Sequence, residues 1–158
     1  MGVGDRVKVK ADIGGGIDQF IGDLDRLGDK AEDISKRAIY EGANILADAV
    51  RKKIEGLSTA GRLTDYEKQG MLDGLGVAPM KKYGQEINTK IGMHGYNKHR
   101  TKKYPQGQPN AMIARSVEGG TSFRKPQPFI QPAVDQYKNK AQSAMSAEFD
   151  RQVGQIVK

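Results

Sequence analysis

Apolar side chains recur at every third or fourth position along two long stretches of the chain. The first stretch runs from about Lys30 to Ile54, and its apolar positions are Ile34, Ala38, Ile39, Ala43, Ile45, Leu46, Ala49 and Val50. The second runs from about Pro132 to Val157, and its apolar positions are Ile130, Val134, Tyr137, Ala141, Met145, Phe149, Val153 and Ile156. Because this spacing places the apolar side chains on one face of an α-helix, the patterns predict two long amphipathic helices. We expect Gln131 or an adjacent residue to cap the second helix, since a proline such as Pro132 is tolerated in a first turn.

Two shorter helices are also predicted. Apolar residues at helical spacing from Ile17 to Leu27 follow the Gly14–Gly16 run, which we interpret as a flexible linker. Asn110 is the expected N-cap of a helix over Ala111–Val117, which Gly119 would terminate, and a strand is the alternative for this segment.

Alternation of apolar and polar residues predicts β-strands in other parts of the chain. It is found over Arg6–Ala11 and, more clearly, over Glu86–Met93. Leu75–Met80 is a further strand candidate, and Pro79 within it favours an edge position because proline cannot donate to a neighbouring strand. Lys81–Gly84 is the expected hairpin turn between the last two strands.

Together these elements predict an α+β fold. In this fold, long N-terminal and C-terminal amphipathic helices pack on a small, mostly antiparallel β-sheet. The 158 residues show no internal repeat and fit a single domain spanning residues 1–158, with residues 1–16 as a flexible or strand-forming arm. Hydrophobic residues make up 37% and Trp is absent, so the core is small for this length. Such a core favours an elongated shape, or a fold that neighbouring subunits complete.

A long basic loop is expected over His94–Pro109, because this segment shows no apolar period. At about sixteen residues the loop is longer than a compact domain usually leaves without secondary structure, so it is either functional or disordered. Its cations are Lys98, Arg100, Lys102 and Lys103, interleaved with Tyr96 and Tyr104. The chain has a net charge of +7, which also points to an acidic partner. The loop therefore contacts either nucleic acid phosphates or an acidic protein neighbour.

The sequence offers no set of residues that would carry catalysis. There is no cysteine, and His94 and His99 lie among cations without a nearby carboxylate, so we expect no metal site. No serine lies in a GxSxG motif. We therefore expect neither enzymatic activity nor a cofactor. No run of about 18 apolar residues is present, and the start lacks a signal-peptide core, so we expect no membrane contact and synthesis in the cytoplasm.

The segment Glu118–Ala133 carries a family resemblance. It is similar to the joint of the head–tail joining, or tail-completion, proteins in the neck of long-tailed bacteriophages. The matching residues are Glu118, Gly120, Thr121, Pro128, Phe129, Pro132 and Ala133, with Ile130 in place of leucine. Ala60–Leu63 partly matches the family's Thr-Gly-x-Leu turn, and the order of elements agrees over most of the chain. Gly119 replaces an aromatic residue of the family, and Gln131 replaces an arginine.

The resemblance implies a structural virion protein of the neck, assembled in the cytoplasm of the bacterial host. It implies a homo-oligomeric ring with six-fold symmetry between head connector or adaptor proteins and tail terminator or tail-tube proteins. It implies no catalytic residues. The residues expected at the subunit or partner interface are Glu118, Gly120, Thr121, Pro128, Phe129 and Pro132.

In such a ring, DNA must pass quickly, and lysines lining the channel would hold it back. We therefore expect Lys98, Arg100, Lys102 and Lys103 to meet an acidic neighbouring protein, with transient contact with phage DNA as the alternative. A free-standing basic protein that binds nucleic acid is the rival interpretation of the whole chain.

Overall fold

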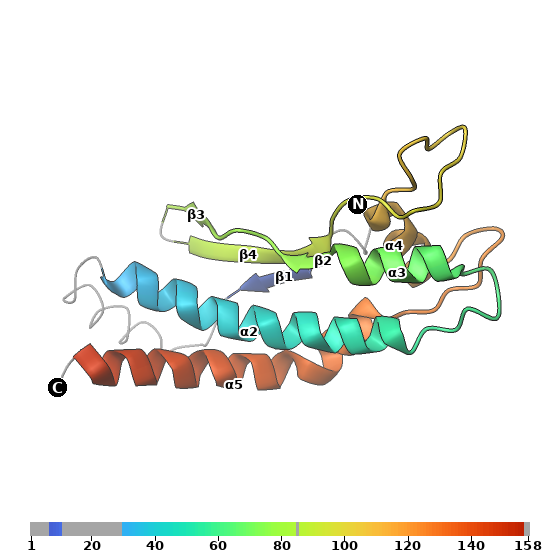
Figure 1. Ribbon diagram of the computed structural model, residues 1–158. Helices are drawn as coiled ribbons and strands as arrows, with labels where there is room; N and C mark the ends of the chain where they lie inside the picture. The colour runs from blue at the N-terminus through green and yellow to red at the C-terminus, as the bar shows by residue number, and fades with distance from the viewer. Residues whose placement is uncertain (1–6, 11–29, 85, 157–158) are drawn as a thin grey trace.

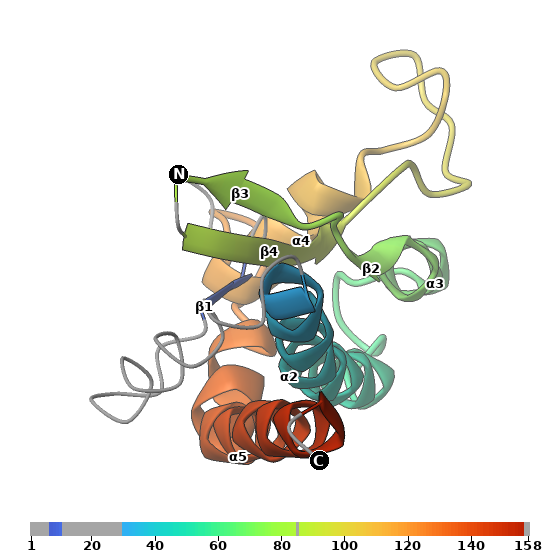
Figure 2. The same cartoon turned by 90° about the vertical axis from the view of Figure 1, so that its left-hand side faces the viewer.

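The computed structural model describes residues 7–10, 30–84 and 86–156. Two long helices, α2 (Lys30–Glu55) and α5 (Ile130–Ile156), lie side by side and run in opposite directions along the molecule (Figure 1). The sheet lies on one side of α2 and α5 lies on the other, as the view along the helices makes clear (Figure 2). The fold is therefore layered, with α2 in the middle.

The sheet is antiparallel and is built around β4 (Glu86–Met93). On one side β4 pairs with β1 (Val7–Lys10). On its other side β4 pairs first with β2 (Leu75–Val77) and then with β3 (Lys81–Tyr83). Because β2 and β3 follow each other along the same edge of β4, they act as one interrupted outer strand.

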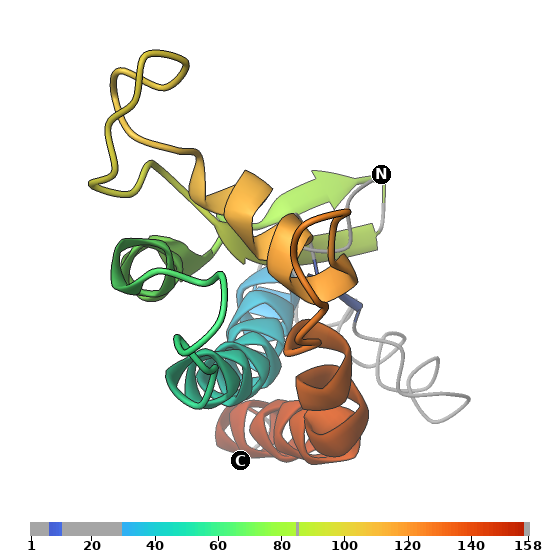
Figure 3. The ribbon, with the colours of Figure 1, turned by 90° about the vertical axis from the view of Figure 1, so that its right-hand side faces the viewer.

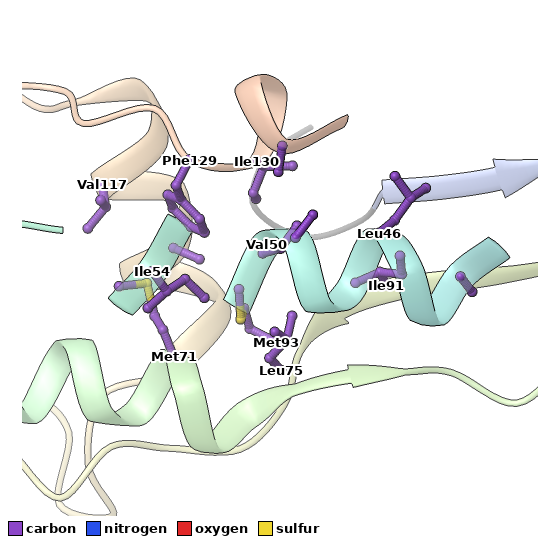
Figure 4. Close-up of a cluster of buried hydrophobic side chains, with 14 of the residues drawn as sticks. Leu46, Val50, Ile54, Met71, Leu75, Ile91, Met93, Val117, Phe129 and Ile130 are labelled. Atoms are coloured by element: carbon purple, nitrogen blue, oxygen red, sulfur yellow. The ribbon is translucent and has the colours of Figure 1, made fainter. Parts of the chain in front are cut away.

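The main core lies between α2, the sheet, the start of α5 and two short helices, α3 (Asp65–Gly74) and α4 (Asn110–Gly119). Phe129 is 0% exposed and packs in the same cluster as Ile54, Met71 and Val117 (Figure 4). Burying a side chain of this size contributes about 1.5–3 kcal/mol to stability. A smaller cluster of Ile34, Ala38 and Phe149 joins α2 to the other end of α5.

The predicted fold class is confirmed, with long helices packed together on a small antiparallel sheet. The predicted long helices, the Glu86–Met93 strand and the strand within Arg6–Ala11 are all present. The strand in Leu75–Met80 is shorter than predicted and ends at Val77. The predicted linker at Gly14–Gly16 and the helix over Ile17–Leu27 lie outside the described residues.

Two local predictions are wrong. Lys81–Tyr83 is not a turn, because it pairs with β4 as β3, and the chain turns at Gly84 instead. Asn110 is not an N-cap, because it is the first residue of α4, after Pro109. Its buried side chain instead donates from Nδ2 to the His94 carbonyl oxygen over 2.7 Å. The segment is a helix rather than the alternative strand, and it continues through Gly119 to a C-cap at Gly120.

Candidate functional site

Residues 118–133, called the joint below, connect α4 to α5. The joint and residues 94–109, called the basic loop, extend from the same end of the molecule (Figure 3). The predicted interface residues lie in the joint and the predicted cations lie in the basic loop. The structure therefore brings both sets to one end of the fold.

The carboxylate of Glu118 caps the start of α5. Its Oε2 accepts hydrogen bonds from the backbone N–H groups of Phe129 at 2.6 Å and Ile130 at 2.9 Å. Its Oε1 accepts from the N–H of Gln131 at 3.0 Å. The first N–H groups of a helix have no partner inside the helix, and the helix dipole favours a negative charge beside them. The cap predicted at Gln131 or a neighbour is thus supplied by the end of α4, and Gln131 instead donates its side-chain amide to Asp135 at 2.9 Å.

Gly120 makes the sharp turn that begins the joint. Its φ of 75° lies in the region that favours glycine, and a Cβ there would lie 2.8 Å from Cδ of Pro126. The turn is closed by the N–H of Thr121, which donates to the carbonyl oxygen of Arg124 at 2.9 Å. A Cβ on the preceding Gly119 would meet no atom of the described chain within 4 Å. An aromatic side chain, which the resemblance implies at this position, would therefore begin in open space.

Arg124 ties the joint to the start of α3. Its Nη2 lies 2.7 Å from Oε2 of Glu67, and the exposed side-chain fractions are only 8% and 5%. Its Nη1 donates to Oγ of Ser116 at 3.1 Å. Glu67 at the same time completes a capping box, since its Oε1 accepts from the N–H of Thr64 at 2.9 Å. One buried carboxylate thus holds both the helix start and the joint.

Gln127 ties the joint to the segment after α2. Its Oε1 accepts from the N–H of Ser58 at 3.1 Å, and its Nε2 donates to the carbonyl oxygen of Ser58 at 3.2 Å. With Glu118 and Arg124, this contact fixes the joint at separate points of the fold. The joint is therefore a preformed surface.

The predicted interface residues divide between the inside and the outside of the joint. Phe129 is fully buried and Glu118 is 6% exposed, so both shape the joint from within. Thr121 and Pro128 are exposed, while Gly120 and Pro132 are half-buried. Sequence reasoning did not select Phe123, which is 62% exposed beside Thr121 and Arg124. It also missed Arg124 and Glu67, although the Thr-x-x-Glu spacing of a capping box marks Glu67 as the start of a helix.

The basic loop has an ordered base. The Asn97 N–H donates to the Gln108 carbonyl oxygen at 2.9 Å, and Asn97 Nδ2 donates to Gln108 Oε1 at 3.0 Å. The base packs closely on α3, because a Cβ on Gly70 would lie 2.7 Å from Cβ of Asn97. Beyond this base the cations Lys98, Arg100, Lys102 and Lys103 are all exposed. Lys103 Nζ lies 5.6 Å from the ring centre of Tyr104, a cation–π contact.

A groove lies between α3 and the base of the loop, with a volume of about 370 Å³. Its lining includes Asp65, Tyr66, Gln69, Asp73, Tyr96 and Lys98. Tyr66 is 56% exposed and Tyr96 is 57% exposed. The groove thus holds two aromatic rings and two carboxylates beside the single cation Lys98, and we call it the acidic groove.

Neither a metal-binding cluster nor a membrane-spanning helix is found in the described part of the chain. Among them, no group of three or more His, Cys, Asp or Glu side chains could hold a metal ion. None of the helices in the described ranges is both long enough and apolar enough to cross a lipid bilayer. The joint, the basic loop and the acidic groove form one surface at this end of the molecule. A surface of this kind suits contact with other macromolecules.

A family model matches most of the chain. The family model is described as "Bacteriophage HK97-gp10, putative tail-component", and it matches residues 18–120 of the chain. This range includes α2, the described strands except β1, the basic loop and α4, and it ends at the turn of Gly120. Comparisons with curated proteins and with solved structures gave no match.

Proposed function

This chain belongs to the HK97-gp10-like family of bacteriophage tail components, and from that premise we propose that it joins the phage head to the tail. The family is structural and not enzymatic, so the chain is a structural protein of the phage tail that contacts other virion proteins. In the proposed role it lies in the neck of the virion, between the head connector and the tail tube. It acts there as one subunit of a six-fold ring.

The observation that carries this proposal is the rigid joint. Residues 118–133 resemble the joint of neck proteins, and here they are fixed by Glu118, Arg124 and Gln127. A segment held in one shape loses little conformational entropy when a neighbour binds to it. Such a surface suits a ring, in which every subunit must present the same contact to the next.

Within the joint, we propose that exposed residues make the contact and buried ones shape it. Phe123, Thr121 and Pro128 would touch the neighbouring subunit or a neck partner. Glu118 and Phe129 would act indirectly, because their side chains are enclosed by the chain itself. Large exposed apolar groups are typical of protein interfaces, and Phe123 is the largest at the joint.

Genetic complementation tests the neck function. A phage that lacks the gene should produce DNA-filled heads and complete tails that remain separate, as seen by negative-stain electron microscopy. Supplying the wild-type chain should restore joined particles, and purified chain should form rings, alone or on isolated tails. Normal joined particles in the absence of the chain would refute the proposal.

The exposed cations of the basic loop support one rival, a free-standing protein that binds nucleic acid. This rival predicts an affinity for DNA that falls steeply with salt, because each phosphate contact releases counterions. Replacing Lys98, Arg100, Lys102 and Lys103 by Gln should then abolish DNA binding. Under the neck proposal the same variant should weaken head–tail joining, and the wild-type chain should show little affinity for DNA at physiological salt.

A further inference from the structure

The cations near the tip of the basic loop have no counter-charge within the described chain. Arg100, Lys102 and Lys103 make no ion pair with any described residue, and Lys103 Nζ lies 5.6 Å from the centre of the Tyr104 ring. All three side chains are exposed. Elsewhere on the surface Lys36 and Lys82 are paired with Glu32 at 3.0 Å, whereas, among the described residues, exposed lysines such as Lys138 stand singly on their helices. The loop therefore presents a concentrated positive charge that remains available to a partner.

The acidic groove presents the complementary features. Asp65, Gln69 and Asp73 are spaced four residues apart along α3, so they lie on one face of that helix. Neither aspartate makes an ion pair within the described residues, although Asp73 accepts a hydrogen bond from Gln69 at 2.8 Å. Tyr66 and Tyr96 add aromatic faces, which attract guanidinium and ammonium groups. Carboxylates beside aromatic rings form a suitable receptor for arginine and lysine side chains.

The loop tip points away from the groove of its own chain. The paired base at Asn97 and Gln108 fixes the direction of the loop. In Figures 1, 2 and 3 its tip extends away from α3. Lys98 lines the groove of its own chain and the centre of the His99 ring lies 6.2 Å from that of the Tyr66 ring, but Arg100, Lys102 and Lys103 make no ion pair with Asp65 or Asp73 among the described contacts. The tip can therefore reach the groove of a second molecule.

We propose that the basic loop of one copy docks its tip in the acidic groove of the next copy. Arg100, Lys102 and Lys103 would pair with Asp65 and Asp73, and their stems would pack on Tyr66 and Tyr96. The two surfaces differ, so the contact is head-to-tail, and repeating it closes a ring when the rotation permits. This inference rests on the proposed neck function, because it names the contact that would hold that ring together.

Charge complementarity favours a second copy over DNA as the occupant of the groove. A nucleic acid carries negative charge, and Asp65 and Asp73 would repel it. A second copy also requires no further partner, because each chain carries both the cations and their receptor. The contact should weaken at high ionic strength, since the charges lie at the surface.

Charge reversal tests the proposal with two variants. The loop variant carries R100E, K102E and K103E, and the groove variant carries D65K and D73K. Each variant alone brings like charges together in every contact, so self-association should weaken by at least about tenfold. The control variant reverses Lys52, Lys138 and Lys140, exposed lysines of α2 and α5, and should assemble like the wild type.

Mixing the two variants should restore assembly, because the acidic loop of one then meets the basic groove of the other. A six-membered ring can alternate them around its circumference. Combining all five substitutions in one chain should restore assembly as well. The oligomeric state is measured by light scattering. If the wild type assembles but neither the mixture nor the combined variant does, the loop does not dock in this groove, and the neck function is unaffected.

Disulfide trapping gives a test that also applies if the purified chain is a monomer. The sequence contains no cysteine, so K102C and D73C introduced together form the only thiol pair. In assembled phage particles, mild oxidation should produce a ladder of covalently linked copies, and K102C alone should not. Recovery of monomer only from joined particles would overturn the proposed contact while leaving the neck function in place. Particles joined normally without the chain would instead overturn the neck function itself.

Discussion

The guanidinium of Arg124 and the carboxylate of Glu67 form a buried ion pair, with Nη2 and Oε2 2.7 Å apart. The two residues are 57 positions apart in the sequence. The pair connects the joint to the start of α3, next to the basic loop and the acidic groove. The joint and the α3 side of the acidic groove are therefore held in place by the same buried ion pair.

Breaking this pair should destabilise the fold strongly. R124M leaves the Glu67 carboxylate buried without its counter-charge, and E67Q does the same to Arg124, so each should lower the free energy of unfolding by about 3–5 kcal/mol. E67Q removes the charge but keeps the capping box, because glutamine can still accept the hydrogen bond from the Thr64 N–H. In a double-mutant cycle measured by urea denaturation, R124M with E67Q should cost much less than the sum of the single changes. Additive effects would indicate that the two residues act independently.

Removing the cap of α5 should destabilise the junction between the helices. E118A deletes the acceptor of the Phe129, Ile130 and Gln131 N–H groups, two of which donate from buried residues. We expect a loss of about 1–3 kcal/mol in the free energy of unfolding, the cost of leaving such donors unpaired. Glu55→Ala, at an exposed position of α2, is the matched control and should change stability by less than about 0.5 kcal/mol. Equal effects of the two substitutions would contradict the capping role.

Two adjacent glycines should respond differently to alanine. At Gly120, alanine must adopt a φ of 75° and meets the carbonyl oxygen of Arg124 at 3.0 Å. G120A should therefore destabilise the protein by about 1–3 kcal/mol. G119A places its Cβ in open space and should be neutral or slightly stabilising, because alanine favours the helix. Thermal unfolding of the two variants measures both effects. If G120A is as stable as the wild type, the turn at this position does not require glycine.

Stability should fall on acidification partly through Glu148. Hydrogen bonds from Arg151 and Gln152 lower the pKa of the Glu148 carboxyl from 4.5 to about 2. Because the pKa is lower in the folded chain, this contribution is present above pH 4.5 and is lost as the pH falls towards about 2. Arg151 is 55% exposed, so solvent screening limits the effect to less than about 1 kcal/mol. Denaturation curves of wild type and E148Q should differ at neutral pH and converge near pH 2, and a constant difference would exclude this origin.

Substitutions at Phe123 and Phe129 should distinguish a role in the proposed interface from a role in stabilising the fold. F129A removes a fully buried ring and should lower the free energy of unfolding by about 3–5 kcal/mol. F123S alters a side chain that is 62% exposed, so the fold should keep its stability within about 0.5 kcal/mol. Under the proposed contact, F123S should nevertheless reduce the yield of joined particles in complementation. Full head–tail joining with F123S would exclude Phe123 from the interface.

The sequence alone was sufficient to predict α2, α5 and β4. Each buries one face in the core. Apolar residues therefore recur at the helical or strand period in the sequence, and this spacing predicts the element. The family resemblance was likewise carried by local motifs, such as Glu118 to Thr121 and the prolines before α5. Boundaries were harder to predict. Lys81–Tyr83 shows no alternation because all three residues are exposed, and β3 exists because β4 supplies its hydrogen bonds.

What the tertiary structure decided is how distant polar groups are satisfied. Glu118 caps a helix that begins twelve residues later, and Arg124 pairs with Glu67 across the fold. Asn110 looked like a cap by local rules, but its side chain is buried and reaches His94 instead. The spacing of apolar residues cannot predict such contacts. A hydrogen bond or ion pair between residues distant in sequence forms only when packing brings them close together. The sequence by itself therefore determined the elements and the family, and the tertiary structure determined how the joint is held and which of its residues face outward.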